Sequence, residues 1–242
     1  MYQAAYLSMS ELVEMIDSPD RQICQQILLD NGELFRQVQG SSRNHQAWPG
    51  GYWDHVVECM NMAVVLYDTL NDLRPLGFSL SDALLVLFLH DIEKPWKYEL
   101  DKNAQSQDKP ELQDKAARMQ FRKAKLDEYG FRLTKAQGNA MYYVEGEFKD
   151  YSNQVRRQWP LGAFVQMCDN NSGRLWPNHP LTQDDPWTGA GRVADQEHVL
   201  ASNWICPTCG SDSSMLKYHT LNPGGMAGEP DISCRNCGLV IR

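Results

Sequence analysis

The amino-acid sequence predicts a mainly helical domain followed by a small β module at the C-terminus. Apolar residues recur at helical spacing through most of residues 8–168. Residues 80–96 contain the most apolar helix, which runs up to a His90-Asp91 pair. This helix indicates the middle of a domain because it is apolar almost all round. After residue 200 the helical pattern stops and two CxxC pairs follow, which favours a separate small fold.

Length and composition limit the possible organisation. The 242 residues suffice for one sizeable domain and a small appendage. The net charge of −8, from 23 basic and 31 acidic side chains, argues against a general nucleic-acid coat protein and leaves room for a local basic channel. We expect a helical lead-in packing on the core at 1–40, the main domain at 41–180, a linker or ordered loop at 181–200 and the β module at 201–242.

The chain shows neither a secretory signal nor a long apolar run. The N-terminus lacks a basic segment followed by an apolar one, and no stretch approaches the roughly 18 apolar residues that span a bilayer. We therefore expect a soluble, cytoplasmic protein without a membrane partner.

Capping residues and breakers divide the main domain into helices. Ser79 or Ser81 caps the central helix, and Thr134 caps a later one. A polar stretch at 97–110 indicates a solvated flap outside the core. The expected helices are 8–17, one from Pro19 that ends at Asn31-Gly32, 52–70, 80–90, 111–129, 134–144 and 159–168, the last ending in Asp169.

Three of these helices carry polar side chains where an apolar face should continue: His55, the His90-Asp91 pair and Asp169. Taken singly, His55 fits a satisfied core histidine and Asp169 a turn residue. Taken together they indicate a metal site, because a divalent cation accepts imidazoles and carboxylates together and removes the cost of burying them.

The sequence resembles the HD-domain metal-dependent phosphohydrolases over residues 44–174. Two motifs support this resemblance. The segment NHQAWPGGYWDH, which contains His55, is similar to the start of this domain in HD-type 3'-5' exoribonucleases, and HDIEKPW is similar to the family's HDIGK turn. The resemblance implies a helical-bundle fold and a metal held by His55, His90, Asp91 and Asp169. It also implies hydrolysis of a phosphate ester or anhydride.

Some features depart from the family pattern. Binuclear members carry further histidines, whereas no histidine occurs between Asp91 and Asp169. We therefore expect one divalent ion, with Mn²⁺, Co²⁺, Mg²⁺, Fe²⁺, Ni²⁺ and Zn²⁺ all open. Glu93 replaces the glycine usual in the family's turn, and this position is where we expect chemistry particular to this protein.

Nearby charged residues are candidates for catalysis and substrate binding. Cations would neutralise the phosphoryl group in the transition state, and a carboxylate would orient water or protonate a leaving oxygen. Each such residue also fits a solvated surface charge. The catalytic candidates are Asp91, Glu93, Lys94, Glu145 and Glu147, and the substrate-binding candidates are His45, Lys94, Arg156 and Arg157. Aromatic candidates for base stacking or for packing are Trp48, Tyr52, Trp53 and Trp96.

The C-terminal cysteines form the strongest motif. Cys206 and Cys209 lie in CPTCG, and Cys234 and Cys237 lie in CRNCG. Four thiolates satisfy tetrahedral Zn²⁺ and leave no open position, so the expected site is structural and its metal replaces a core. The pattern resembles a zinc ribbon, with strands expected at 204–205, 215–219 and 239–241.

The leading functional hypothesis is a nucleotidase or (d)NTP phosphohydrolase with a small nucleotide substrate. The alternative is an HD-type 3'-5' exonuclease or other phosphodiesterase acting on single-stranded nucleic acid. A third option is a non-catalytic protein that senses a metal or nucleotide and binds a partner. A homo-oligomer is open, and the zinc module would serve structure or oligomerisation.

Overall fold

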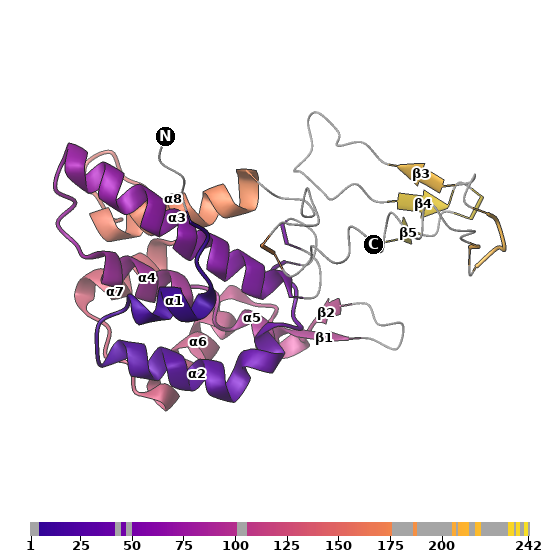
Figure 1. Cartoon of the computed structure of the whole chain (residues 1–242), viewed down its shortest axis with the longest axis horizontal. Helices are drawn as coiled ribbons and strands as arrows, with labels where there is room; N and C mark the ends of the chain where they lie inside the picture. Colours follow the sequence, from indigo (N-terminus) through magenta and orange to yellow (C-terminus); the bar gives the residue numbers. More distant parts are fainter. Residues whose placement is uncertain are drawn as a thin grey trace.

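The computed structural model is mainly helical, which confirms the predicted class of the main domain (Figure 1). None of the helices described is both long and apolar enough to cross a membrane. The structure describes residues 5–41, 45–46, 50–100, 106–175, 186–187, 205–206, 208–212, 216–218, 232–234, 236–237 and 240–241.

Helices α1 (Met9–Glu14) and α2 (Asp20–Phe35) open the chain. Ser8 caps α1 through a capping box with Glu11. The predicted end of α2 at Asn31-Gly32 is wrong, because the helix continues to Phe35, which is 1% exposed in the core. Burial of this ring against α3 and α5, through Tyr52 and Trp96, outweighs the low helix propensity of glycine.

Helices α3 (Gly51–Leu73) and α4 (Leu80–Leu89) form the centre of the domain. Ser79 rather than Ser81 caps α4, in a capping box with Asp82, whereas the Ser81 hydroxyl accepts a hydrogen bond from the backbone of Asp17. Every residue of α4 from Ala83 to Leu89 is buried. Helix α4 packs against α1, α3, α7 and α8, as its uniformly apolar sequence predicts.

The segment after α4 contains more regular structure than the predicted flap. Strands β1 and β2 pair antiparallel, with Tyr98 opposite Asp108, and residues 101–105 lie outside the described part. Gly130, with φ of 82°, ends α6 in a left-handed conformation. The elements are α5 (Lys94–Lys97), β1 (Tyr98–Leu100), β2 (Ser106–Asp108), the 3₁₀ turn η1 (Pro110–Leu112) and α6 (Lys115–Tyr129).

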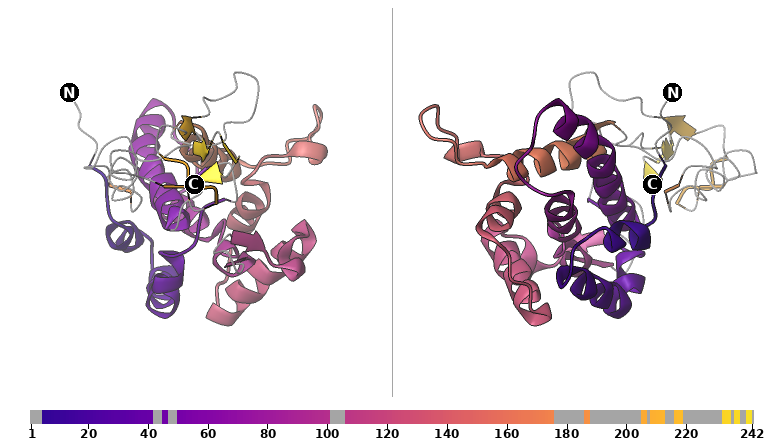
Figure 2. Two further views of the ribbon diagram at one scale, coloured as in Figure 1. Left: turned by 90° about the vertical axis from the view of Figure 1, so that its right-hand side faces the viewer. Right: turned by 60° about the vertical axis from the view of Figure 1, so that its left-hand side comes forward.

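Helices α7 (Lys135–Tyr143) and α8 (Pro160–Leu175) complete the bundle, with Thr134 capping α7 as predicted. The 3₁₀ turn η2 (Phe148–Asp150) belongs to the connection between them, which projects from the helices (Figure 2). The prediction that α8 ends at Asp169 is wrong. Helix α8 continues through Ser172, which is buried against Gln46 and His55, so Asp169 projects from within the helix.

The described C-terminal residues include a three-stranded antiparallel sheet in the order β3-β4-β5. Strand β4 was not predicted, whereas the predicted strand at 204–205 is represented by an isolated bridge between Ile205 and Asp212. The strands are β3 (Leu216–Tyr218), β4 (Ile232–Cys234) and β5 (Val240–Ile241). The predicted linker or ordered loop at 181–200 lies outside the described residues except for Pro186 and Trp187.

Candidate metal centre

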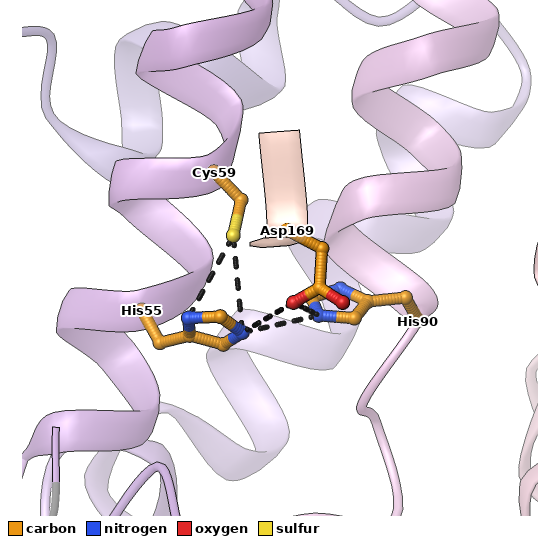
Figure 3. Close-up of side chains that lie close together, drawn as sticks. All are labelled: His55, Cys59, His90 and Asp169. Atoms are coloured by element: carbon orange, nitrogen blue, oxygen red, sulfur yellow. Dashed lines mark hydrogen bonds and ion pairs between the residues drawn. The ribbon is translucent and has the colours of Figure 1, made fainter. Parts of the chain in front are cut away.

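The four predicted ligands come together where α3, α4 and α8 meet, and Figure 3 shows three of them, His55, His90 and Asp169. His55 projects from the second turn of α3, His90 caps the C-terminus of α4 and Asp169 projects from α8. Asp91 follows His90 directly. Both histidines are buried, and the two carboxylate side chains are only 12% and 18% exposed.

The donor atoms of these residues are spaced as ligands of one cation. His55 Nε2 lies 3.3 Å from His90 Nε2 and 3.1 Å from Asp169 Oδ1. Asp91 Oδ2 lies 3.2 Å from His90 Nε2 and 3.6 Å from His55 Nε2. Two N or O ligands about 2.0–2.2 Å from one ion are about 2.8–3.1 Å apart at octahedral angles and about 3.3–3.6 Å apart at tetrahedral angles. The observed spacing therefore fits a single ion.

A contact at Nδ1, the ring nitrogen that faces away from the cluster, fixes each imidazole. His90 Nδ1 donates to the carbonyl oxygen of Leu87 at 2.6 Å, which leaves Nε2 to face the cluster. His55 Nδ1 is 3.1 Å from the Ser172 hydroxyl, and its Nε2 also faces the cluster. Hydrogen bonds of this kind orient histidine ligands in metalloproteins.

Electrostatics within the cluster also favour a cation. Burial lowers the pKa of His55. Burial alone would lower the pKa of His90 too, but the carboxylates of Asp91 and Asp169 outweigh it and raise the value to about 10. For Asp169, burial raises the pKa, and the hydrogen bonds from His55 and His90 overcome this and hold it well below its usual range. The two carboxylates thus stay charged, paired with the protonated His90 ring when no metal is bound, and a divalent ion would replace that proton.

Lys94 lies beside the cluster and contacts it directly. Its Nζ is 2.5 Å from Asp91 Oδ2. Burial lowers the pKa of Lys94, but the Asp91 carboxylate outweighs this and raises it, so the ammonium remains charged. Lys94 is therefore placed to orient Asp91 and to add positive charge next to a bound anion.

His45 and Gln46, which precede α3, lie on the His55 side of the cluster. The His45 and His55 ring centroids are 4.7 Å apart, and burial lowers the pKa of His45 to about 3. His45 Nδ1 is 2.6 Å from the Gln46 side-chain oxygen. The buried amide of Gln46 donates in turn to the carbonyl oxygen of Ser172 at 3.2 Å. His45 is thus a neutral imidazole beside the histidine and aspartate cluster, and its predicted contact with substrate stays a prediction.

This segment depends on a glycine at the start of α3. A Cβ on Gly51 would lie 1.8 Å from the backbone oxygen of Gln46, which no side chain tolerates. The Gln46 carbonyl also accepts a hydrogen bond from the backbone of Gly40 at 2.8 Å. Gly51 is therefore required for the close approach that brings His45 onto His55.

Glu93 forms a buried ion pair with Arg122. Arg122 of α6 donates to both Glu93 carboxylate oxygens at 2.9 Å, and the Glu93 side chain is 4% exposed. Such a bidentate pair is rigid and strong. The contacts favour a structural role for Glu93, anchoring α6 to the turn that follows His90-Asp91, over the predicted acid or water-orienting role.

The other residues predicted to act in catalysis or substrate binding lie on the connection between α7 and α8. Glu145 pairs with Lys115 at 2.8 Å, and Glu147 accepts from the backbone N–H groups of Arg157 and Gln158. The side chains of Arg156 and Arg157 are exposed. None of the described contacts of these residues involves the four predicted ligands, so their catalytic and binding roles stay predictions.

Most of the described aromatic residues that were candidates for base stacking pack against other side chains of the domain. Tyr52 and Trp96 both contact Phe35 edge-on, and the Arg36 guanidinium lies 4.1 Å from the Trp53 ring. Trp48 lies outside the described residues. These contacts favour packing over base stacking.

Several residues that support the cluster were not predicted from the sequence. Cys59 and Ser172 follow His55 and Asp169 by four and three residues, spacings that put side chains on one helix face. That spacing was a usable signal. Gln46 and Arg122 gave no such signal, because their contacts join segments far apart in the chain.

A second group of metal-binding type occurs in the C-terminal part. The sulfurs of Cys206, Cys209 and Cys237 lie within 4.8 Å of one another, with Cys206 and Cys237 3.6 Å apart. The left-handed Gly210 closes the first CxxC turn by donating to the Cys206 carbonyl at 2.8 Å. The backbone of Cys234 ends β4, and its side chain lies outside the described part.

Comparison of the chain with protein-family models, with curated proteins and with solved structures found no match. A functional proposal therefore depends on the residues, their geometry and the motif resemblance.

Proposed function

We propose that this protein is a metal-dependent phosphohydrolase that cleaves a phosphate ester or anhydride of a nucleotide. One observation carries the proposal: five pairs of donor atoms from His55, His90, Asp91 and Asp169 are 3.1–3.6 Å apart in a buried place. The resemblance of the motifs around His55 and His90-Asp91 to the HD phosphohydrolases supports the same assignment.

The donor set fits a divalent cation of hard or borderline character. Two imidazole nitrogens and two carboxylate oxygens suit Mn²⁺, Co²⁺, Fe²⁺, Ni²⁺ and Zn²⁺, and the carboxylates also suit Mg²⁺. Bound there, such an ion would polarise a phosphate oxygen and lower the pKa of a coordinated water toward neutrality.

The chain's own residues would position the reacting groups. The Lys94 ammonium holds Asp91 at 2.5 Å and adds positive charge where the phosphoryl group gains negative charge. His90 is fixed by Leu87, and His55 by Ser172, so neither imidazole needs to reorganise. The neutral His45 ring beside His55 provides a hydrogen-bonding contact for substrate.

A small nucleotide is the favoured substrate because the chain carries a net charge of −8, which disfavours a polyanion. A second candidate, a 3'-5' exonuclease acting on single strands, is favoured by one surface feature. The connection between α7 and α8 exposes Phe148 and Tyr151 by 70% each, close in sequence to Arg156 and Arg157, and exposed rings beside cations suit stacked bases.

We also infer that the C-terminal cysteines hold a structural Zn²⁺. The 3.6 Å separation of the Cys206 and Cys237 sulfurs is close to the edge of a tetrahedron with Zn–S bonds of about 2.3 Å. Cys234 completes a set of four thiolates, so this ion would take no part in catalysis.

Turnover assays with site variants test the proposal. The protein would be incubated with Mn²⁺, Co²⁺ or Mg²⁺ and a panel of ribo- and deoxynucleotides, alongside labelled single-stranded RNA and DNA. Release of phosphate, pyrophosphate or triphosphate identifies the bond that is cut. We expect Asp91→Ala and His55→Ala to lower turnover on the order of a thousandfold or more.

Asp68→Ala is the matched control, because Asp68 is an exposed carboxylate on the same helix as His55. It should leave turnover unchanged, and all variants should keep the zinc of the cysteine cluster. Unchanged turnover in a clean Asp91→Ala preparation would overturn the proposal.

A further inference from the structure

A thiol belongs to the buried histidine and aspartate cluster. Cys59 lies four residues after His55, on the same face of α3, and is 0% exposed. Its sulfur is 3.7 Å from His55 Nδ1 and 3.8 Å from His55 Nε2. Figure 3 shows this sulfur pointing from α3 toward the His55 ring.

The thiol is near the other ligands as well. Donor atoms of His55, Cys59, His90 and Asp169 all lie within 4.8 Å of one another. A nitrogen and a sulfur bound to one tetrahedral ion, at about 2.05 and 2.3 Å, are about 3.6 Å apart. The observed 3.8 Å from the Cys59 sulfur to His55 Nε2 is close to this value. The 3.7 Å to Nδ1 places the sulfur beside the ring, so binding requires the Cys59 side chain to turn toward the Nε2 side, where His90 and Asp169 lie.

The other buried single cysteines are placed differently. Cys24 and Cys168 are also 0% exposed, yet neither belongs to a metal-binding group among the described residues. Cys168 even precedes Asp169 directly and still projects from another side of α8. Burial in this core therefore does not by itself bring a thiol to the ligands, and the position of Cys59 is distinctive.

We infer that Cys59 is a further metal ligand, which makes the helical site one for a borderline ion such as Zn²⁺, Co²⁺ or Fe²⁺ rather than for Mg²⁺. Thiolate is a soft ligand that selects such ions, whereas Mg²⁺ prefers oxygen. The inference rests on the metal centre of the proposed function and specifies the kind of metal it takes.

Coordination by Cys59 also balances the buried charge. The thiol proton leaves to solvent when the sulfur binds. The thiolate, Asp91 and Asp169 then carry three negative charges, which match a divalent ion and the Lys94 ammonium beside Asp91. A net charge of zero in a buried cluster lowers the free-energy cost of burying its ions.

Cobalt spectroscopy tests this ligand without relying on activity. The full-length protein, with Zn²⁺ first bound to the C-terminal cysteines, would be titrated with Co²⁺ and monitored by absorption. A thiolate ligand gives a sulfur-to-cobalt charge-transfer band in the near ultraviolet, whereas imidazole and carboxylate ligands give only weak visible bands. We expect the near-ultraviolet band in the wild-type protein and its loss in Cys59→Ser.

Cys168→Ser is the matched control, since it removes an equally buried thiol next to a ligand and should keep the band. Any Co²⁺ that exchanges into the C-terminal site contributes equally to all three proteins and cancels in difference spectra. Cys59→Ala is a second variant in case the buried serine hydroxyl disturbs folding, which circular dichroism would reveal.

The results separate this inference from the proposed function. Visible cobalt bands with no near-ultraviolet band lost in either Cys59 variant would overturn the thiolate ligand and leave the metal centre intact. Absence of Co²⁺ binding to the helical site would overturn both. With Cys59 as ligand, affinity for Co²⁺ and Zn²⁺ should fall on the order of tenfold or more in Cys59→Ser, while affinity for Mg²⁺ changes little.

Discussion

The two metal-binding groups of this protein relate to their surroundings in opposite ways. The histidine and aspartate cluster lies among α3, α4 and α8, whose contacts form a continuous core. The cysteine cluster joins short turns and strands of two or three residues. On the proposed function, packing positions the ligands of the first region and a bound metal would add chemistry. In the second region we propose that a metal supplies most of the stability of a small module.

Metal removal should give the largest difference between the regions. A strong chelator under reducing conditions should unfold the C-terminal module, because its folding free energy comes from the metal. The helical domain should retain its helix signal. Circular dichroism would measure the helices, and hydrogen exchange over residues 205–241 would measure the module. Collapse of the helix signal on chelation would contradict the contrast.

Substitution of Gly51 tests how far packing controls the helical site. A Cβ there would lie 1.8 Å from the Gln46 carbonyl oxygen, so Gly51→Ala should cost about 2–4 kcal/mol of unfolding free energy and weaken metal binding. Urea unfolding and metal titration would measure the two effects.

Gly138→Ala in α7 is the matched control for Gly51→Ala, since a Cβ on Gly138 meets nothing within 4 Å. This substitution should stabilise the protein by up to about 1 kcal/mol. Equal effects of the two substitutions would show that the segment before α3 does not support the site.

Glu93→Gln distinguishes a structural from a catalytic carboxylate. The substitution weakens the buried pair with Arg122 and should cost about 3 kcal/mol of stability, while turnover per folded molecule changes less than about tenfold. Thermal unfolding and turnover assays would be compared. Glu145→Gln, in an exposed pair with Lys115, should cost less than about 1 kcal/mol. A hundredfold loss of turnover at full stability would instead restore Glu93 as the acid.

Ser172→Ala should give the smallest effect, on metal affinity more than on stability. The substitution removes the hydroxyl 3.1 Å from His55 Nδ1, and loss of such a supporting contact lowers metal affinity about tenfold. Isothermal titration with Co²⁺ would measure it, with the exposed Ser10→Ala as control. Unchanged affinity would mean that α3 packing alone orients His55.

The contrast also explains what the sequence could predict. The buried character of α4 and the caps at Ser79 and Thr134 follow from local patterns, and the structure confirms them. The ends of α2 and α8 do not follow from local patterns, because contacts with distant residues extend both helices past the residues that were expected to end them. Phe35 packs on Tyr52 and Trp96.

The candidate site shows the same division. The four predicted ligands could be singled out because each is a polar residue in or next to an apolar helix pattern, and the structure brings them together. The partner of Glu93 was not predictable, since Arg122 lies 29 residues away on another helix. Likewise, the buried amide of Gln46 meets Ser172 across 126 residues. Contacts of this range depend on the packed fold rather than on local spacing.

Metal content is the most direct test of the central claim that packing builds one catalytic metal site while a second metal builds the cysteine module. Elemental analysis of the wild-type protein should find one transition metal in the helical domain and one zinc in the module. His90→Ala should lose only the first, and Cys209→Ser only the second. Two ions in the helical domain, or one that persists in His90→Ala, would contradict the account.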